Sequence, residues 1–562
     1  MEQTIFSPLE DYEKKLREIH KTNTEAFFEE LVNRSGIDQM ANKASVAAYN
    51  AQQEKADAEE KKAGRWKAMR LASIIGVVIA VITAIVCLIK GIALVGFCAA
   101  LVGLTLMLLW LLVLNPKIKN LNQILANEKE KAEQLLAICR QQMAPLNALM
   151  TGWDGVELIE KVIPQLDFLP NFSSELEKDM LENYDFSEND NEDQTVIDTL
   201  SGRYNGNPFL FERRRVHKMG TETYHGYKTI TWSTWYTDSN GKRRRRTNSQ
   251  TLHATVTKPK PFYHLETYLH YGSQAGPDLS FSRLNKHLED LSQRALDSLV
   301  RKGEKKLRKK AADALEKNKN FTGMTNTEFD VLFDALDRDH EVQFRLLFTP
   351  LAQTNMMDLL RSETGYGDDF DFFKQQRMST IVSEHSQNRS LLLAPEKIHS
   401  HDFELIRQYF MEQHQEYFKA VYFDFAPLLA VPAYQDPPVH SLDPLPDLAQ
   451  RYSTWEHEAL ANSLDSRLLA HPHTETPLII KTAYLGRNGQ AEEVRVTTHS
   501  YNTVDRVDVV AVSGGDGRIH MVRVPWQEYI PLQTSEVMSI TTEKPEESSV
   551  HTHGLYARVR KE

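Results

Sequence analysis

Cysteine is scarce in this chain of 562 residues. Only Cys87, Cys98 and Cys139 are present, too few for a disulfide framework. Such usage is typical of a protein whose bulk lies in a reducing compartment. The sequence also lacks a Gly-rich phosphate loop of the Walker type and a serine flanked by glycines as in a nucleophile elbow. We therefore predict no catalytic residue and no bound cofactor.

A complete metal-ligand set is also missing from the sequence. A His-x-His pair can ligate zinc from a strand, but the site needs a third ligand. Three such pairs occur, each in loop-like or terminal sequence: His399/His401, His471/His473 and His551/His553. We predict no metal site from them.

An excess of positive charge is absent as well. The chain has 66 basic and 77 acidic residues, a net charge of −11. A nucleic-acid binder usually carries a basic excess or a basic face, so nucleic acid is not expected as a partner.

One long apolar stretch dominates the first third of the chain. Residues 71–89 and 91–114 carry no charge, and Lys90 lies between them. A single helix over 71–114 would measure about 66 Å, roughly twice the hydrocarbon thickness of about 30 Å. We therefore predict two membrane spans, 71–89 and 91–114, joined by a turn at Lys90-Gly91 and closed by Asn115-Pro116. The alternative is a buried hairpin in a soluble core.

The basic residues around these spans predict their orientation. Lysines and arginines flank both outer ends, whereas the connecting turn holds only Lys90. Positively charged flanks stay in the cytoplasm, so we expect a multi-pass protein of the cell's inner (plasma) membrane with both termini cytoplasmic. The flanking cations are Lys61, Lys62, Arg65, Lys67, Arg70, Lys117 and Lys119.

Helical periodicity continues on both sides of the spans. Apolar residues recur at three and four positions in 7–68 and again in 117–149, which predicts amphipathic helices. Because both helices leave the membrane together, they can pair as an antiparallel stalk; the alternative is two surface helices packed on a later domain.

The remainder predicts a mixed α+β fold. The hairpin signal Asn240-Gly241 joins two strand patterns, and helical spacing continues from about Ser282 to Lys317. Beyond a proline-rich break, four short strand patterns form two hairpins. The predicted organisation is a stalk (1–68), a transmembrane hairpin (69–115), a returning helix (116–150), an acidic linker (151–200), a cytosolic α+β domain (201–431), a Pro-rich linker (432–447), a small β-rich domain (448–534) and a flexible tail (535–562).

Two segments carry a resemblance. "SGRYNGNPF" and the later "FDVLFDALDRDHEVQFRLLFTPLAQTNMMDLL" resemble a family of uncharacterised bacterial membrane proteins over roughly residues 1–430. The resemblance implies a helix, two adjacent spans, a cytosolic α+β domain and a bacterial source. It implies no activity and no catalytic residues.

Two basic clusters are the sharpest candidate sites. The run Lys242, Arg243, Arg244, Arg245 and Arg246 comes directly after the hairpin turn. Its arginines can pack on Trp232, Trp235 and Tyr236 of the partner strand, or they can contact anionic lipid or an acidic partner. On the long helix, Lys302, Lys306 and Lys309 form either a solvated face or a second anionic-surface contact.

These observations favour a binding function. We expect a membrane-tethered cytosolic scaffold or adaptor that binds a protein partner or the anionic leaflet, besides the bilayer that its spans cross. The alternatives are an enzyme with a divergent active site in the α+β domain and, third, an oligomeric channel or transporter subunit. Whether the chain forms a homo-oligomer stays open.

Overall fold

The computed structural model describes residues 5–90, 92–187, 191–237, 239, 241–316, 321–438, 451–489, 491–542, 550–552 and 555–560. Contacts divide the chain into two compact units. The sheet unit comprises Met1–His20, Gly155–Leu392 and Tyr417–Glu562, and the helical unit comprises Lys21–Asp154 and Leu393–Glu416. The predicted mixed α+β architecture is confirmed.

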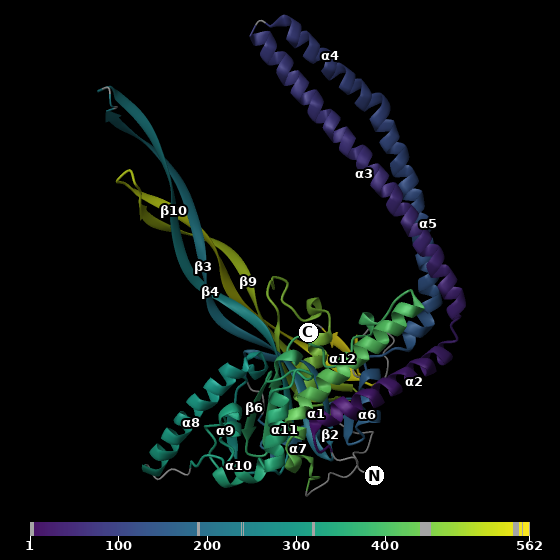
Figure 1. Cartoon of the computed structure of the whole chain (residues 1–562), viewed down its shortest axis with the longest axis vertical. Coiled ribbons are helices and arrows are strands. Elements are labelled where there is room, and N and C mark those ends of the chain that lie inside the picture. The colour runs from purple at the N-terminus through teal and green to yellow at the C-terminus, as the bar shows by residue number, and fades with distance from the viewer. Residues whose placement is uncertain are drawn as a thin grey trace. The chain divides into compact units, whose positions relative to one another are not determined.

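The helical unit is built on a long helical hairpin (Figure 1). Helix α3 (Gln39–Ile89) begins where Asp38 accepts a hydrogen bond from the Ala41 amide and ends at Lys90. Helix α4 (Ala93–Leu109) then runs back, so the apolar stretch forms two helices, as predicted. Lys90 caps α3, while Gly91 of the predicted turn lies outside the described residues.

The second apolar helix does not end at Asn115-Pro116, contrary to our prediction. Residues Trp110–Leu114 form a π-helical turn, η2, that continues directly into α5 (Asn115–Leu149). Pro116 occupies the first turn of α5, where a missing N–H is tolerated. The helical path therefore continues past Pro116.

The predicted antiparallel stalk is confirmed by polar contacts between α3 and α5. The Gln52 amide donates to a Glu128 carboxylate oxygen at 2.6 Å, and the Lys129 ammonium lies 2.9 Å from a Glu60 oxygen. The helix predicted over 7–68 is interrupted, however, because Gly36 adopts a φ of +61° between α2 (Arg17–Ser35) and α3.

The apolar part of this hairpin is mostly exposed. Its two most apolar 18-residue windows are only 17% and 11% buried, whereas a core helix of a soluble protein is mostly buried. Both helices are thus long and apolar enough to cross a membrane.

The sheet unit contains a seven-stranded antiparallel sheet. One of its strands, most of a second and the helix α7 (Ser174–Asn183) fall within 151–200, so the predicted acidic linker is wrong. The Ser173 hydroxyl caps α7 by accepting from the Leu176 amide, and Val196 and Leu200 are buried, so this segment packs despite its acidic residues. In pairing order the strands are β1 (Leu166–Leu169), β2 (Gln194–Tyr204), β3 (Asn207–Thr237), β4 (Arg243–Gly272), β7 (Met378–Ser383), β6 (Phe370–Gln375) and β5 (Ser280–Arg283).

Helices pack beside this sheet around an aromatic core in which Phe333, Phe344 and Phe348 contact one another. The long helix predicted from about Ser282 begins instead at Gln293. The preceding residues Ser280–Arg283 pair with β6 and form the strand β5. The helical segments are α1 (Pro8–Asp11), η1 (Tyr12–Leu16), α6 (Asp154–Val162), η3 (Leu288–Asp290), α8 (Gln293–Glu316), α9 (Thr327–Phe333), α10 (Glu341–Leu347), α11 (Pro350–Leu360), η4 (Glu384–Ser386), α12 (Phe403–Leu429), η6 (Pro432–Gln435), α13 (Thr454–Ser463) and η7 (Ser466–Leu468). Helix α12 is shared with the helical unit, which also holds η5 (Pro395–Lys397).

A second antiparallel sheet lies in the C-terminal part of the chain. The two middle strand patterns predicted from the sequence are one continuous strand, β9. The predicted flexible tail is partly ordered, because β12 pairs with the end of β10 and buries Leu555 and Ala557. Residues 439–447 of the predicted Pro-rich linker lie outside the described residues, while Tyr434 and Gln435 before them are buried. In pairing order the strands are β11 (Val550–Thr552), β12 (Leu555–Arg560), β10 (Ile519–Thr541), β9 (Ala491–Ser513) and β8 (Ile479–Asn488).

Candidate functional site

The two longest hairpins of the sheet unit stack on each other (Figure 1). We call their paired outer parts the β-arm, residues 220–258 of the β3–β4 hairpin and 504–528 of the β9–β10 hairpin. The contact buries an apolar cluster between them, and burial of such side chains stabilises the stack. The cluster consists of Ile230, Leu252, Ala254, Val522 and Val524.

Gly226 allows the closest approach of the two hairpins. A Cβ at this position would lie 2.3 Å from the Arg523 carbonyl oxygen. Polar contacts flank the cluster: the Lys228 ammonium donates to the Met521 carbonyl at 3.2 Å, and the Lys258 ammonium lies 2.7 Å from an Asp508 oxygen. The β-arm is therefore two layers thick.

The β3–β4 hairpin reaches beyond its partner (Figure 1). The β9–β10 turn lies against β4, where the Gly515 amide donates to the Gln250 side chain at 2.7 Å. Beyond that point, the described residues 234–237, 239 and 241–247 are all exposed. We call residues 234–247 the arm tip; its sequence contains five cations and one carboxylate, Asp238. Asp238 and Asn240, part of the predicted turn, lie outside the described residues.

The strand register places aromatic rings opposite arginines at the arm tip. Trp235 pairs with Arg245 and Tyr236 with Arg244. These rings remain 62% and 48% exposed, so pairing with the arginines does not cover them. Trp232, which the sequence also offered as a partner, packs instead against the interhairpin cluster.

The second basic cluster is divided by the fold. Lys302 and Lys306 line a cavity of about 180 Å³ between α8 and the end of α9, together with Lys286 and Asp334. Lys309, predicted to act with them, is not among the cavity's lining residues.

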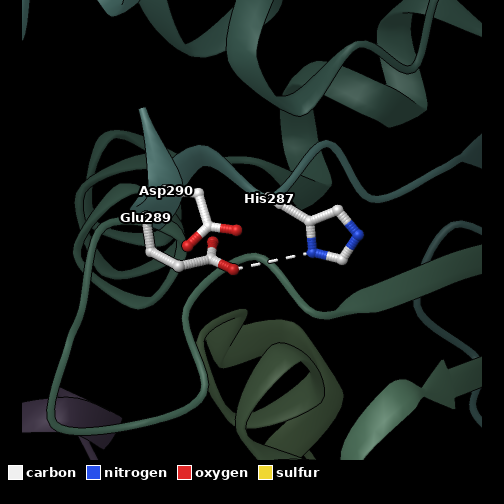
Figure 2. A group of neighbouring side chains, drawn as sticks. All are labelled: His287, Glu289 and Asp290. Carbon is white, nitrogen blue, oxygen red and sulfur yellow. Dashed lines mark ion pairs between the residues drawn. The ribbon is translucent and has the colours of Figure 1, made fainter. Parts of the chain in front are cut away.

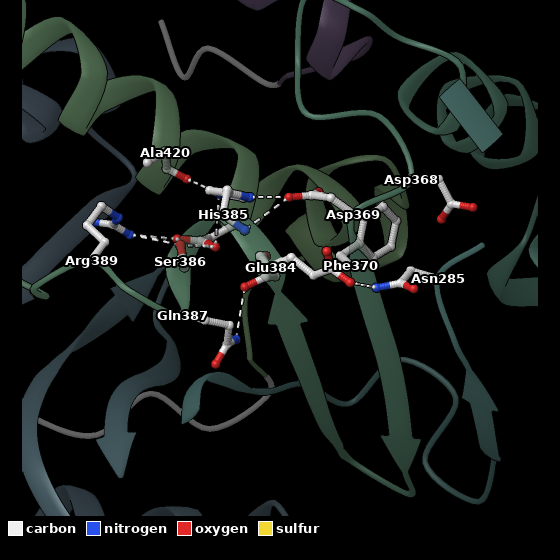
Figure 3. Close-up of polar contacts among 12 residues, drawn as sticks. Asn285, Asp368, Asp369, Phe370, Glu384, His385, Ser386, Gln387, Arg389 and Ala420 are labelled. Atoms are coloured by element: carbon white, nitrogen blue, oxygen red, sulfur yellow. Dashed lines mark hydrogen bonds and ion pairs between the residues drawn. The ribbon is translucent and has the colours of Figure 1, made fainter. Parts of the chain in front are cut away.

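A polar cluster missed by sequence reasoning lies near η4 (Figure 3). The Ser386 hydroxyl donates to Asp424, with its two carboxylate oxygens each 2.8 Å away, rather than to His385. Arg389 contacts the same carboxylate at 2.9 Å. Burial alone would lower the pKa of His385, but Asp424 and Asp369 hold it above its ordinary value. Ser386 thus belongs to a buried network with Asp424 and Arg389 and lacks the serine–histidine hydrogen bond of an acyl-transfer triad in this structure.

Figure 2 shows a loop cluster of His287, Glu289 and Asp290. Within the described ranges it is the one group of three His, Cys, Asp or Glu ligand atoms lying within 4.8 Å of one another. One Glu289 oxygen already accepts a hydrogen bond from the Asp368 amide at 2.8 Å. The cluster offers three ligands for a cation but no complete site; its signal in the sequence is the short run "HLED".

The predicted His-x-His pairs gain no third ligand in the part of the chain that the structure describes. The rings of His471 and His473 lie 5.5 Å apart, beside a cavity of about 740 Å³ whose lining includes His471 and Arg215. Arg215 donates to the Leu478 carbonyl at 3.0 Å, and burial lowers its pKa. His553 lies outside the described residues.

Comparison with known proteins adds no identity: the chain matches no family model, no curated protein and no solved structure.

Proposed function

We propose that this chain is a membrane-tethered scaffold of a bacterial inner membrane, whose β-arm makes a second contact with the anionic face of the bilayer. The helical hairpin is the anchor, with both chain termini in the cytoplasm. The observation that carries the proposal is the arm tip, the exposed end of a long hairpin with five cations and two exposed aromatic rings.

The composition of the arm tip suits a lipid headgroup layer. Tryptophan and tyrosine are enriched at membrane interfaces because one side of the ring is apolar and the other polar. Each Lys or Arg near an anionic leaflet contributes about 1 kcal/mol. Arg243, Arg245 and Arg246 make no ion pair within the described part of the chain, so their charges are available.

Strand geometry limits the strength of this contact. Successive side chains point to opposite faces, so Arg244 and Arg246 of β4 share one face and Arg243 and Arg245 the other, while Lys242 directly precedes the strand. Only two or three cations meet a flat surface together, which gives about 2–3 kcal/mol. That is insufficient for a stand-alone anchor, but it is useful to a protein that its helices already confine to the membrane.

The β-arm and the stalk are both several tens of ångströms long. From Gly220 to the turn, the arm spans about 20 residues, or about 65 Å at about 3.3 Å per residue. The stalk part of α3 before the apolar stretch covers residues 39–70, or about 48 Å at about 1.5 Å per residue. The β-arm is thus longer than the stalk part of α3.

A fluorescent probe at the arm tip tests the proposal. The full-length protein, with Ser239→Cys carrying an environment-sensitive dye and Cys98→Ser removing the exposed native thiol, is reconstituted in nanodiscs of neutral or partly anionic lipid. We expect a blue shift in anionic nanodiscs that high salt removes, because screening shortens the range of attraction to a few ångströms.

Two variants test whether the fluorescence shift depends on the cations of the arm tip. Changing Lys242–Arg246 to serine should remove the shift, while Lys309→Ser, which removes a cation elsewhere, should leave it. An equal signal in neutral and anionic nanodiscs contradicts lipid contact. If the shift instead appears only on adding an acidic protein, the arm binds a protein partner.

A further inference from the structure

The cavity beside α8 is shaped by a close helix contact. Gly303 faces Val331 of α9, and a Cβ on Gly303 would lie 2.3 Å from a Val331 methyl carbon. Lys302 and Lys306 flank this glycine and line the cavity. Since they are four residues apart, they lie on one face of the helix. That face turns toward α9, so the two lysines are not part of a purely solvated stripe.

The charge of the cavity is positive. Lys286 donates to the Val331 carbonyl at 3.1 Å and lies 2.7 Å from an Asp334 oxygen. This contact neutralises the only carboxylate among the lining residues. Lys302 and Lys306 have no hydrogen-bond or ion-pair partner within the described residues. Two ammonium groups therefore remain unneutralised at the mouth of one cavity.

The volume of the cavity limits which ligands it can hold. A volume of about 180 Å³ equals roughly six water molecules at about 30 Å³ each. It is smaller than the 300–1,000 Å³ or so of sites that hold a whole drug-sized molecule. A tetrahedral anion with five heavy atoms fits, while a complete nucleotide does not. Lysine ammoniums are common ligands of phosphate, acting as point charges.

We propose that Lys302 and Lys306 form a binding site for a phosphoryl group, with Lys286 holding Asp334 away from the anion. The group is either a free phosphate monoester or the monoester headgroup of a lipid such as phosphatidic acid; both present the same tetrahedral phosphate monoester. This site is separate from the arm tip and does not depend on it.

Phosphorus NMR on the detergent-solubilised full-length protein tests the site, with inorganic phosphate as the probe. Exchange with the protein should broaden the phosphate resonance. Lys302→Gln and Lys306→Gln should each weaken binding about tenfold, because each removes one of two free charges. Lys309→Gln is the matched control on the same helix and should bind as the unchanged protein does. All three side chains are exposed, so these changes should not unfold the chain.

Further measurements identify the source of the phosphoryl group and test whether surface charge alone explains the binding. Monomeric short-chain phosphatidic acid should compete with phosphate at the same lysines. If it competes about ten times more strongly than glycerol 3-phosphate, the ligand is a lipid headgroup. If the two compounds compete equally, the ligand is a free monoester. Absence of broadening, or an equal loss in Lys302→Gln and Lys309→Gln, overturns the site. Serine variants of Lys242–Arg246 should bind phosphate normally, so failure here is distinct from failure of the arm-tip proposal.

Discussion

Gly226→Ala tests whether the two hairpins of the β-arm are held together as the structure shows. The new methyl group would lie 2.3 Å from the Arg523 carbonyl oxygen, whereas ordinary contacts begin at 3.4 Å. The hairpins must therefore separate by about 1 Å. Overpacking of this kind costs about 1–3 kcal/mol.

The stack should loosen without coming apart. Leu252, Val522 and Val524 are each at most 2% exposed, and full burial of such side chains is worth about 1.5–3 kcal/mol each. The remaining apolar contact thus exceeds the strain. We expect amide hydrogen exchange in the stacked strands to rise about 5- to 150-fold, since about 1.4 kcal/mol corresponds to a factor of ten.

Hydrogen exchange measured by mass spectrometry over residues 222–232 and 520–526 provides the assay. Gly220→Ala on the same strand is the control, because its Cβ would meet mainly the ring of Phe262, a side chain 45% exposed that can turn away. Unchanged exchange in Gly226→Ala, or an equal rise in both variants, would refute the stacked arrangement.

Three further predictions concern topology and pH. Cysteines at Ser7 and Ser548 should both resist a membrane-impermeant thiol reagent in intact cells; labelling of either contradicts two spans with cytoplasmic ends. Lys90→Leu should leave a C-terminal reporter on the same side, because a helix of about 66 Å cannot match a bilayer of about 30 Å; a reporter that moves outside would show that Lys90 specifies the turn. Burial lowers the pKa of Lys374 to about 7, against about 10.4 in an unfolded chain. The unfolded state therefore binds more protons between pH 7 and 10, and stability should fall as pH falls through this window, by at most about 1.4 kcal/mol per unit. Lys374→Met should remove this dependence in urea unfolding measured at pH 7 and 10; equal slopes for both proteins would contradict it.

The sequence by itself determined the features that depend on local pattern. The long apolar stretch with a single lysine in its middle predicts two helices, each long enough to cross a membrane, because one helix over the whole stretch would be about twice the hydrocarbon thickness of a bilayer. Heptad-like spacing on both flanks predicts the stalk, and Asn240-Gly241 marks the long hairpin. The alternation of apolar and polar residues likewise indicates the β-rich C-terminal part.

Long-range packing decided what the local pattern could not. The segment 173–195 looks like a linker because it is acidic, yet Leu176 and Met180 are buried in a core shared with Trp455, almost 300 residues away. Pro116 was expected to end the helix, but the π-helical turn Trp110–Leu114 continues directly into α5. The apolar spacing that predicted a helix from about Ser282 begins at Leu284, directly after β5, whereas pairing with β6 makes Ser280–Arg283 a strand.

The two basic clusters also differ in how much of each the sequence alone reveals. Lys242–Arg246 stand out in the sequence because a charge run at a hairpin turn is exposed whatever the fold does elsewhere. The separation of Lys302 and Lys306 from Lys309 is invisible there, since all three belong to one basic helix. It follows from tertiary structure: Gly303 lets α8 pack closely on α9, and Lys286, from the segment between β5 and η3, lines the same cavity. The stacking of two hairpins nearly 300 residues apart was likewise decided by tertiary contacts, since apolar burial between two sheets has no local signature along the chain.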